Sequence, residues 1–447
     1  MATDGSEERC GPRRFPEATF VCDRQAVRRG GCILHAPKLT PEEKERLSPE
    51  ERKAEELFEN EFRATLAALI EERIRNRQRG FGAIRFAHVP WKEPPFRQAI
   101  DNAWEFAGCI FDQGFDLSSS SIKNGLFRHA VFRGRTSLNF ADLQDLTFIG
   151  ARFEGPADFA GARFRGFNNF AATVFESELW FRWAKIYDGH VWFRGEPPDH
   201  CFKGPCDFYR LEIQPGGKLS FEHVNLGKAS FTYVDLERPL FLDVNWYKPA
   251  GGLIRRGPSL WDEFRPRGPR DDIDGSRRLV AASYRQLVLS YERRRDYETA
   301  ESFHVGEMEA RRKELGSDRL AGRLSRAFNF YNAYRLMSNY GTGIWQALLV
   351  LVAIIAASSM LFLFAGFRPV DSTHVIRYVP ALRVPPLAVL WDFGRAFLLT
   401  LSIATMQRDR PYEPVGDWSH ALGSLALLLI ASQAALVLLA VRRRFRR

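Results

Sequence analysis

Ala141-Asp142-Leu143-Gln144-Asp145 is one copy of a five-residue unit that recurs through the middle of the chain, and Ala151-Arg152-Phe153-Glu154-Gly155 is another. Each copy has a large apolar residue at its centre and a small residue two positions earlier. A period of five fits neither the α-helix, with about 3.6 residues per turn, nor the β-strand, with a period of two. The central apolar residues of the regular runs are Leu117, Ile122, Phe127 and Phe132; Leu138, Leu143, Phe148 and Phe153; and Phe221, Leu226, Phe231, Leu236, Phe241 and Trp246.

Repetition at a fixed period is typical of a solenoid, in which each repeat stacks on the next. A period of five requires a square coil, in which each unit forms one side and points its central residue inward. Six-residue steps, such as Phe132 to Leu138, separate the runs. Twenty of the 37 phenylalanines lie between Trp104 and Trp246, and these rings would fill a narrow coil. The alternative is a Phe-rich sandwich with accidental spacing.

These units closely resemble the small–polar–Leu/Phe–polar–Gly/polar unit of the pentapeptide-repeat family. The resemblance implies a right-handed quadrilateral β-helix with about four pentapeptides per turn, and residues 104–247 would then form about seven coils at the usual strand spacing. Residues 187–218 contain four prolines and break the rhythm, so we expect them to protrude as a loop around one inward-facing residue, Cys206.

Helical segments flank the repeats. Residues 37–103 form a predicted cap, with apolar residues at three- and four-residue steps and a helix start at Thr40-Pro41-Glu42-Glu43. Residues 248–275 are rich in Pro, Gly and Arg and are interpreted as a linker. Residues 276–343 predict a helical hairpin, with two helices meeting near Asp296, and then a juxtamembrane helix.

Two uncharged segments predict a membrane domain over residues 344–447. Ile344 to Phe367 contains 24 residues without a charge, and His420 to Val441 contains 22. Roughly twenty apolar residues span a bilayer core, so spans over about 344–367 and 420–441 are expected. Arginines gather before the first span and after the second, where five lie between Arg442 and Arg447. By the positive-inside rule, both ends face the cytosol and the intervening loop faces outward.

A third apolar segment, residues 387–406, lies inside that loop and carries Asp392 and Arg395. A complete third span would cost several kcal/mol for these charges unless they pair. A re-entrant or interfacial helix is the cheaper alternative. The arrangement of span, short helix and span is also that of small two-helix channels, although no potassium-filter motif follows the helix. The candidate pore or membrane-active residues are Asp392, Arg395, Thr400, Ser402 and Thr405.

The segment Tyr334-Arg335-Leu336-Met337-Ser338-Asn339-Tyr340-Gly341 directly precedes the first span. It resembles the Ser-Asp/Asn-Tyr-Gly element of bacterial pentapeptide-repeat proteins with a C-terminal two-helix, ion-channel-like membrane domain. The resemblance implies a multi-pass protein of the cell inner membrane, with the repeat domain and the C-terminus in the cytoplasm. Its juxtamembrane candidates are Tyr334, Ser338, Asn339, Tyr340 and Gly341.

The N-terminal segment, residues 1–36, contains a candidate structural zinc site made by Cys10, Cys22, Cys32 and His35. Thiolate and imidazole are the usual ligands of structural Zn²⁺, although Cys10 and Cys22 lack the usual close spacing. The alternative is a disordered terminus with unconnected thiols. No secretory signal is seen, so we expect the soluble part to remain in the reducing cytosol. No catalytic spacing or phosphate-binding loop is present, and we do not expect an enzyme or any other cofactor.

Two functions remain open at this point. The first is a homo-oligomeric pore or channel-like membrane effector, whose cytosolic coil senses or assembles. The second is a membrane-anchored scaffold without conductance, whose repeat faces bind a cytosolic protein. The net charge of +10 suits an anionic partner, and the terminal arginines after an apolar run favour the lipid bilayer over nucleic acid.

Overall fold

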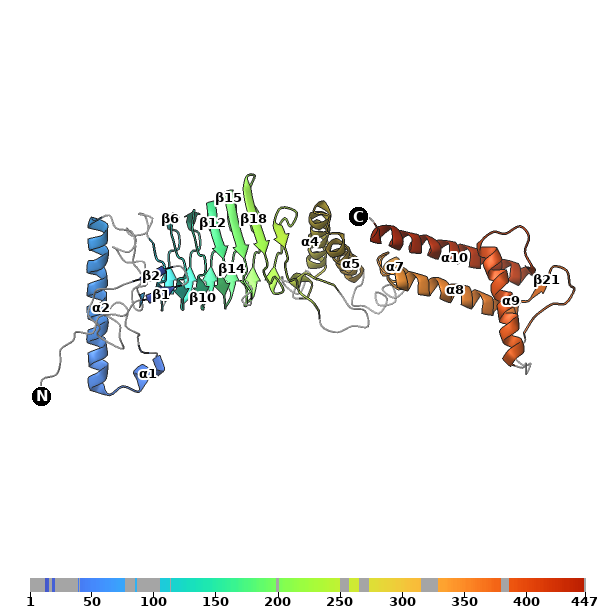
Figure 1. Ribbon diagram of the computed structural model, residues 1–447, viewed down its shortest axis with the longest axis horizontal. Helices are drawn as coiled ribbons and strands as arrows, with labels where there is room; N and C mark the ends of the chain where they lie inside the picture. The colour runs from blue at the N-terminus through green and yellow to red at the C-terminus, as the bar shows by residue number, and fades with distance from the viewer. Residues whose placement is uncertain are drawn as a thin grey trace. The chain divides into compact units, whose positions relative to one another are not determined.

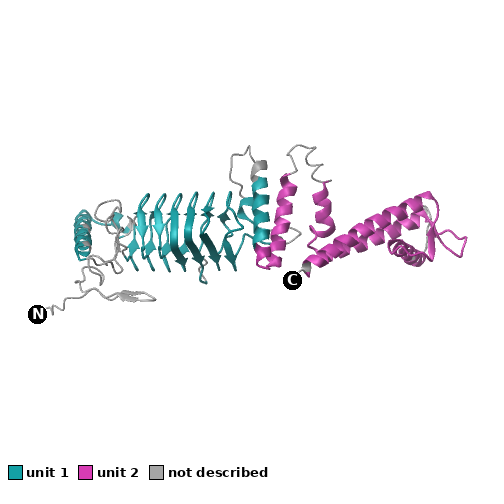
Figure 2. Ribbon diagram, turned by 90° about the horizontal axis from the view of Figure 1, so that it is seen from above, with its two compact units in different colours: residues 1–290 teal, residues 291–447 magenta. Residues whose placement is uncertain are grey.

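The computed structural model describes residues 39, 41–76, 105–249, 257–264, 273–314, 329–378 and 386–445, apart from 113 and 198–200, together with strands β1 (Arg13–Phe15), β2 (Ala18–Phe20) and β3 (Arg85–Phe86). The chain divides into two compact units, Met1–Ser290 and Tyr291–Arg447 (Figure 2). The first contains the strands of the repeat region, and the second contains the apolar helices.

The predicted N-terminal helix is two helices, α1 (Pro41–Glu45) and α2 (Pro49–Arg75). The break arises because Ser48 starts a new helix. The Ser48 hydroxyl accepts from the amide of Glu51 at 3.3 Å, and the Glu51 carboxylate accepts from the amide of Ser48 at 2.8 Å. This is a capping box with Pro49 at the first helical position. Of the apolar residues predicted at three- and four-residue steps, α2 buries Phe58, Phe62, Leu66, Leu69 and Ile70, whereas Leu57, predicted with them, is 63% exposed.

The repeats form a parallel β-solenoid of about six turns, built from three stacked sheets (Figure 1). The first sheet has the order β13-β10-β7-β4-β3 and contains β4 (Ile110–Phe111), β7 (Val131–Phe132), β10 (Arg152–Phe153) and β13 (Val174–Phe175). The second has the order β19-β16-β14-β11-β8-β5 and contains β5 (Gly114–Asp116), β8 (Arg135–Ser137), β11 (Ala157–Asp158), β14 (Leu179–Trp180), β16 (Cys206–Asp207) and β19 (Ala229–Ser230).

The third sheet contains the longest strands. Its order is β20-β18-β15-β12-β9-β6, with β17 beside β15. Its members are β6 (Ser121–Lys123), β9 (Asp142–Gln144), β12 (Arg163–Ala171), β15 (Lys185–Arg194), β17 (Glu212–Ile213), β18 (Gly217–Glu222) and β20 (Leu240–Leu242). All described pairings in the three sheets are parallel, which agrees with a coil that returns to the same sheet once per turn.

The strand register explains why six turns form instead of the predicted seven. Ile110 pairs with Val131 and Val131 pairs with Arg152, so a turn takes 21 residues there. Four five-residue units would take 20 residues, so the twenty-first residue of each such turn comes from one six-residue step in the sequence. Leu179 pairs with Cys206, a separation of 27 residues, because this later turn contains the long strand β15 and the segment after it.

The core of the coil consists of stacked phenylalanine rings. Phe111, Phe132, Phe153 and Phe175 form one column, with ring centroids 4.8, 4.5 and 4.8 Å apart. A second column contains Phe106, Phe127, Phe148, Phe170, Phe193, Phe221 and Phe241. All of these rings are buried. Burial of one such side chain stabilises the fold by about 1.5–3 kcal/mol, so the five-residue period of apolar residues is what holds the coil together.

The prediction that residues 187–218 protrude as a loop is wrong. Their described residues contribute to four strands, β15, β16, β17 and β18, which continue the sheets. Glycines permit this, because a Cβ on Gly189 would collide with the backbone of Gly166 on the neighbouring turn. Pro205 does not interrupt the ladder, because its carbonyl accepts from the amide of Leu179 at 3.0 Å. Cys206 is buried, as predicted.

The last turn of the solenoid is closed by the short helix η1 (Trp261–Glu263) and by α4 (Ile273–Arg293). The buried carboxylate of Asp262 accepts from the Ser230 hydroxyl at 2.5 Å and from the Phe231 amide at 2.8 Å. The Tyr284 hydroxyl on α4 accepts from the Leu260 amide at 2.9 Å and donates to Glu263 at 2.7 Å. Covering the end in this way protects strand edges that would otherwise pair with other chains.

The second unit is helical. It contains α5 (Tyr297–Glu314), α7 (Phe330–Ser338), α8 (Ile344–Ala365), α9 (Pro386–Ala404) and α10 (Asp417–Arg444), with a small hairpin of β21 (Phe367–Pro369) and β22 (Tyr412–Pro414). Three of its helices, α8, α9 and α10, are long and apolar enough to cross a membrane. The α8 and α10 helices lie side by side and antiparallel, and α9 lies steeply across them near the hairpin (Figures 1 and 2).

Candidate functional site at the juxtamembrane junction

The turn between α7 and α8 is built from three consecutive left-handed residues. Asn339, Tyr340 and Gly341 have φ values of 46°, 60° and 75°. Asparagine and glycine tolerate this conformation better than other residues do, which is why this sequence ends the helix here. The amides of Gly341 and Gly343 each donate to the carbonyl oxygen of Ser338 at 3.0 Å, and the Gly341 amide also donates to the Ser338 hydroxyl at 3.0 Å.

Gly341 also has no room for a side chain. A Cβ at this position would lie 2.7 Å from the Tyr334 hydroxyl and 3.1 Å from a methyl group of Leu439 on α10. The five predicted juxtamembrane residues therefore do come together. Tyr334 and Tyr340 contact edge to face at 5.7 Å, and Ser338 and Gly341 bond directly. The turn holds the end of α7 against α10.

A buried carboxylate ties this turn to α5. The side chain of Glu309 is 4% exposed. It accepts from the Tyr340 hydroxyl at 2.7 Å and from Arg312 Nη2 at 2.9 Å, and Arg335 Nε lies 3.3 Å away. Tyr340 is itself fully buried. One acidic side chain on α5 therefore binds both α7 and the turn that precedes the first apolar helix.

The electrostatics of this cluster favour the ionised carboxylate. Burial alone would raise the pKa of Glu309, but hydrogen bonds from Arg312 and Tyr340 and the positive charges of Arg312 and Arg335 outweigh burial and lower it. Burial and the neighbouring carboxylate raise the pKa of Tyr340, so its hydroxyl remains a donor. The cluster therefore keeps its charged hydrogen bonds well below neutral pH.

The α10 helix contributes two further contacts to the junction. Gln433 is fully buried, and its Nε2 donates to the carbonyls of Met337 at 2.9 Å and Ala347 at 2.8 Å. Arg443 Nη1 donates to the carbonyl of Tyr340 at 3.0 Å. A buried polar side chain in an apolar helix is costly unless it bonds internally, so Gln433 fixes how α10 lies against α7 and α8.

Sequence reasoning missed Glu309, Arg312 and Gln433 as members of this site. Gln433 could have been predicted as a site residue, since it is the only amide side chain within the uncharged segment from His420 to Val441. Polar residues inside apolar spans usually face the interior of the helix bundle and bond to another polar group there. Glu309 carries no such signal, because it stands among other charged residues of α5 and only the fold buries it.

The candidate membrane-active residues of α9 do not line one open space within a single chain. Asp392 accepts from the Tyr378 hydroxyl at 2.6 Å and from Arg395 at 3.1 Å. Thr400 is buried and bonds Ser359 of α8 at 3.0 Å. Ser402 is also buried and donates to a backbone carbonyl of its own helix, whereas Thr405 is exposed. The paired Asp392 and Arg395 remove part of the cost of placing charges in an apolar helix.

The predicted zinc ligands Cys10, Cys22, Cys32 and His35 lie outside the described residues. Within the described part of the chain, no group of three or more His, Cys, Asp or Glu side chains could hold a metal ion. The thiols of Cys201 and Cys206 are buried, and burial raises the pKa of both. These two cysteines therefore belong to the core of the solenoid.

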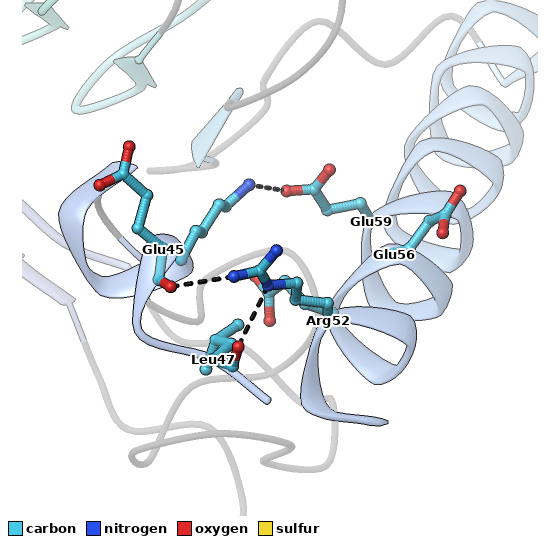
Figure 3. A pocket seen from close by; sticks show the side chains of 7 residues that line it. Glu45, Leu47, Arg52, Glu56 and Glu59 are labelled. Atoms are coloured by element: carbon cyan, nitrogen blue, oxygen red, sulfur yellow. Dashed lines mark hydrogen bonds and ion pairs between the residues drawn. The ribbon is translucent and has the colours of Figure 1, made fainter. Parts of the chain in front are cut away.

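A pocket of about 330 Å³ lies between α1 and α2 (Figure 3). Lys44 pairs with Glu59, and Arg52 donates to the backbone carbonyls of Leu47 at 3.1 Å and Glu45 at 3.0 Å. These bonds join α1 to α2.

Comparison with known proteins gives no relative: no protein-family model matches the chain, and no curated protein matches it.

Proposed function

We propose that the chain is a homo-oligomeric, channel-like effector of the cell inner membrane, in which α8 and α10 span the bilayer, α9 is embedded in the leaflet on the loop side, and the solenoid senses or assembles in the cytosol. The observation that carries this proposal is the position of α9. An anchor needs only spans, whereas this chain adds an apolar helix that lies steeply across them (Figure 1). A right-handed quadrilateral coil, as in pentapeptide-repeat proteins, remains part of the proposal.

The depth of α9 follows from its contacts. Thr400 bonds Ser359, which lies six residues before the end of α8 at Ala365, or about 9 Å along the helix axis. Ile403 lies beside Gly423, since its Cδ1 atom is 3.4 Å from the position that a Cβ on Gly423 would take. Gly423 lies six residues after the start of α10 at Asp417, again about 9 Å along the axis. Helices that lie in the plane of a membrane are typically buried by about 5–10 Å. Both contacts therefore support an α9 that does not cross.

The surface of α9 supports the same placement. The face away from α8 and α10 is apolar and exposed, and it consists of Leu387, Leu390, Trp391, Phe397, Leu398 and Leu401. Trp391 and Trp418 are 74% and 85% exposed at the loop end, and Trp345 is 80% exposed at the junction end. Tryptophan prefers the two membrane interfaces, so these residues fit belts at both ends of the spans.

The charges support a cytosolic junction. In the loop, Arg368 pairs with Glu413 and Arg395 pairs with Asp392. At the other end, Arg442 is exposed and Arg443 bonds a backbone carbonyl. Two of the loop arginines that weaken the sequence-based count are therefore neutralised by acidic partners, and this supports a cytosolic junction end under the positive-inside rule.

A depth measurement tests the arrangement. Leu387, Gly394 and Leu401 are exposed and seven residues apart, so they share one face at intervals of about 10 Å along α9. Each is replaced by cysteine in turn, in a chain whose three N-terminal cysteines are serine, and labelled with an environment-sensitive fluorophore. Quenching by lipids brominated at defined depths then locates each label in liposomes.

Equal, shallow depths at the three positions are expected. Depths that differ by about 20 Å between Leu387 and Leu401 would mean that α9 spans the bilayer. A label at Val352, in the middle of α8, serves as the deep control. Chemical cross-linking and ion flux in the same liposomes test the channel-like activity. Because Thr400 and Ser402 are buried within one chain, a pore requires several copies, and a monomer without flux would leave the scaffold as the function.

A further inference from the structure

His304 lies on α5 in an environment that excludes its charged form. Its side chain is 20% exposed, and its Nε2 atom is buried with no hydrogen-bond partner. Its Nδ1 atom lies 3.9 Å from the nearest carboxylate oxygen, on Glu307, which is too far for a hydrogen bond. An imidazole buried in this way is stable only while it is neutral.

The charged groups around His304 come from α5 and α10. Glu307 and Arg311 lie on its own helix, and Arg311 binds Glu307 at 2.5 Å, so the carboxylate nearest to the imidazole is already paired with a positive charge. Arg443 comes from the end of α10. Burial, followed by the charges of Arg443 and Arg311, lowers the pKa of His304 to about 4.

The carboxylate of Glu309, also on α5, does not offset the charge of a protonated His304. Glu309 is already bound by Arg312 at 2.9 Å and approached by Arg335 of α7 at 3.3 Å. A proton on His304 would therefore add a further positive charge to a junction where guanidinium groups from α5, α7 and α10 already gather. The free-energy cost of this extra positive charge therefore falls on the contacts between α5 and the helices that lead into the membrane.

We propose that His304 makes the junction an acid-sensitive latch: protonation of this imidazole releases α5 from α7 and from the turn before α8, and so uncouples α5 from the membrane helices. Nothing in the latch depends on whether those helices conduct ions. The sensed chemical is the proton itself, at the cytosolic end of α8 and α10.

The direction and size of the effect follow from linkage. In the released state the imidazole has its ordinary pKa near 6.5, and in the latched state about 4. Above about pH 6.5 neither state is protonated at His304, so acidity has no effect. As the pH falls from 6.5 towards 4, the released state takes up the proton first. The ratio of released to latched α5 rises by about 30-fold at pH 5 and by a limiting factor of about 300 below pH 4.

Hydrogen exchange of the full chain in nanodiscs tests the latch. Exchange in peptides from residues 297–314 is measured between pH 8 and pH 5 and corrected for the intrinsic rate at each pH. The wild-type chain is expected to lose protection by about 30-fold over this range. His304→Phe, which keeps a ring but cannot titrate, is expected to change by less than about 3-fold.

Two further variants make the result decisive. His374→Gln removes an exposed histidine of the loop and is expected to follow the wild type. Arg443→Gln removes one of the repelling charges, so its acid-induced loss of protection is expected to be smaller than that of the wild type, and this second variant serves if His304→Phe disturbs packing. The proposal is overturned if wild-type α5 keeps its protection at pH 5, or if His304→Phe loses as much protection as the wild type does.

Discussion

Replacing Glu309 with glutamine tests whether the buried carboxylate holds the junction together. The substitution keeps the shape of the side chain and removes its charge. The wild-type carboxylate accepts from the Tyr340 hydroxyl at 2.7 Å and from Arg312 at 2.9 Å, and its side chain is 4% exposed. No space is opened, so the effect reports the loss of the charge together with the loss of one of the two acceptor oxygens.

The magnitude follows from these contacts. A hydrogen bond to a charged group contributes about 1.5–3 kcal/mol and a neutral one about 0.5–1.5 kcal/mol, so the two bonds together lose about 2–3 kcal/mol. Arg335 adds little, since its side chain is 33% exposed and solvent screens it. We expect Glu309→Gln to lower the local opening free energy of the junction by about 2–3 kcal/mol.

The assay is hydrogen exchange at neutral pH in the full chain, read at the amides of Gly341 and Gly343, which both donate to Ser338. A loss of about 2–3 kcal/mol corresponds to about 30- to 150-fold faster exchange. Glu298→Gln makes the same change at an exposed position in the first turn of α5 and is the matched control. Equal exchange in the two variants would refute the reasoning that the buried charge carries the junction.

Two other substitutions test the core and the turn. Phe153→Ala, which empties a buried site between two stacked rings, is expected to cost about 3–5 kcal/mol in urea denaturation of the solenoid followed by circular dichroism, whereas Phe140→Ala, at a ring that is 63% exposed, should cost less than about 0.5 kcal/mol. Similar losses for both would argue against the stacked core. Gly341→Ala places a Cβ at positive φ against the Tyr334 hydroxyl and is expected to speed exchange of the junction amides by about 10-fold or more; unchanged exchange would show that the turn can relax.

The five-residue period was enough to predict the solenoid and its inward residues. Phe132 and Phe153 are buried and stacked, as their spacing requires. The period predicts the core because every turn repeats the same local environment, so each five-residue unit contributes one core residue at the same position. It failed at residues 187–218, where prolines indicated a loop. Prolines exclude a strand only where their missing amide is needed, and the long strand β15 contains none of them.

The apolar helices were also readable from the sequence, since the length of an uncharged segment is a local property. The sequence contains two local helix-start signals, one at Thr40 and one at Ser48, and the prediction used only the first. The resemblance pointed to the juxtamembrane residues from Tyr334 to Gly341, which the structure brings into one turn.

The repeat, the apolar segments and the residues of the turn before α8 can be read along the chain, because each of these depends on sequence neighbours. The packing of the helices, in contrast, places α9 across α8 and α10, buries Thr400 against Ser359 and brings Glu309 to Tyr340. Glu309 and Tyr340 are 31 residues apart in the sequence. A contact at that distance depends on how helices pack, and helix packing is set by shapes and buried polar groups that no local pattern records.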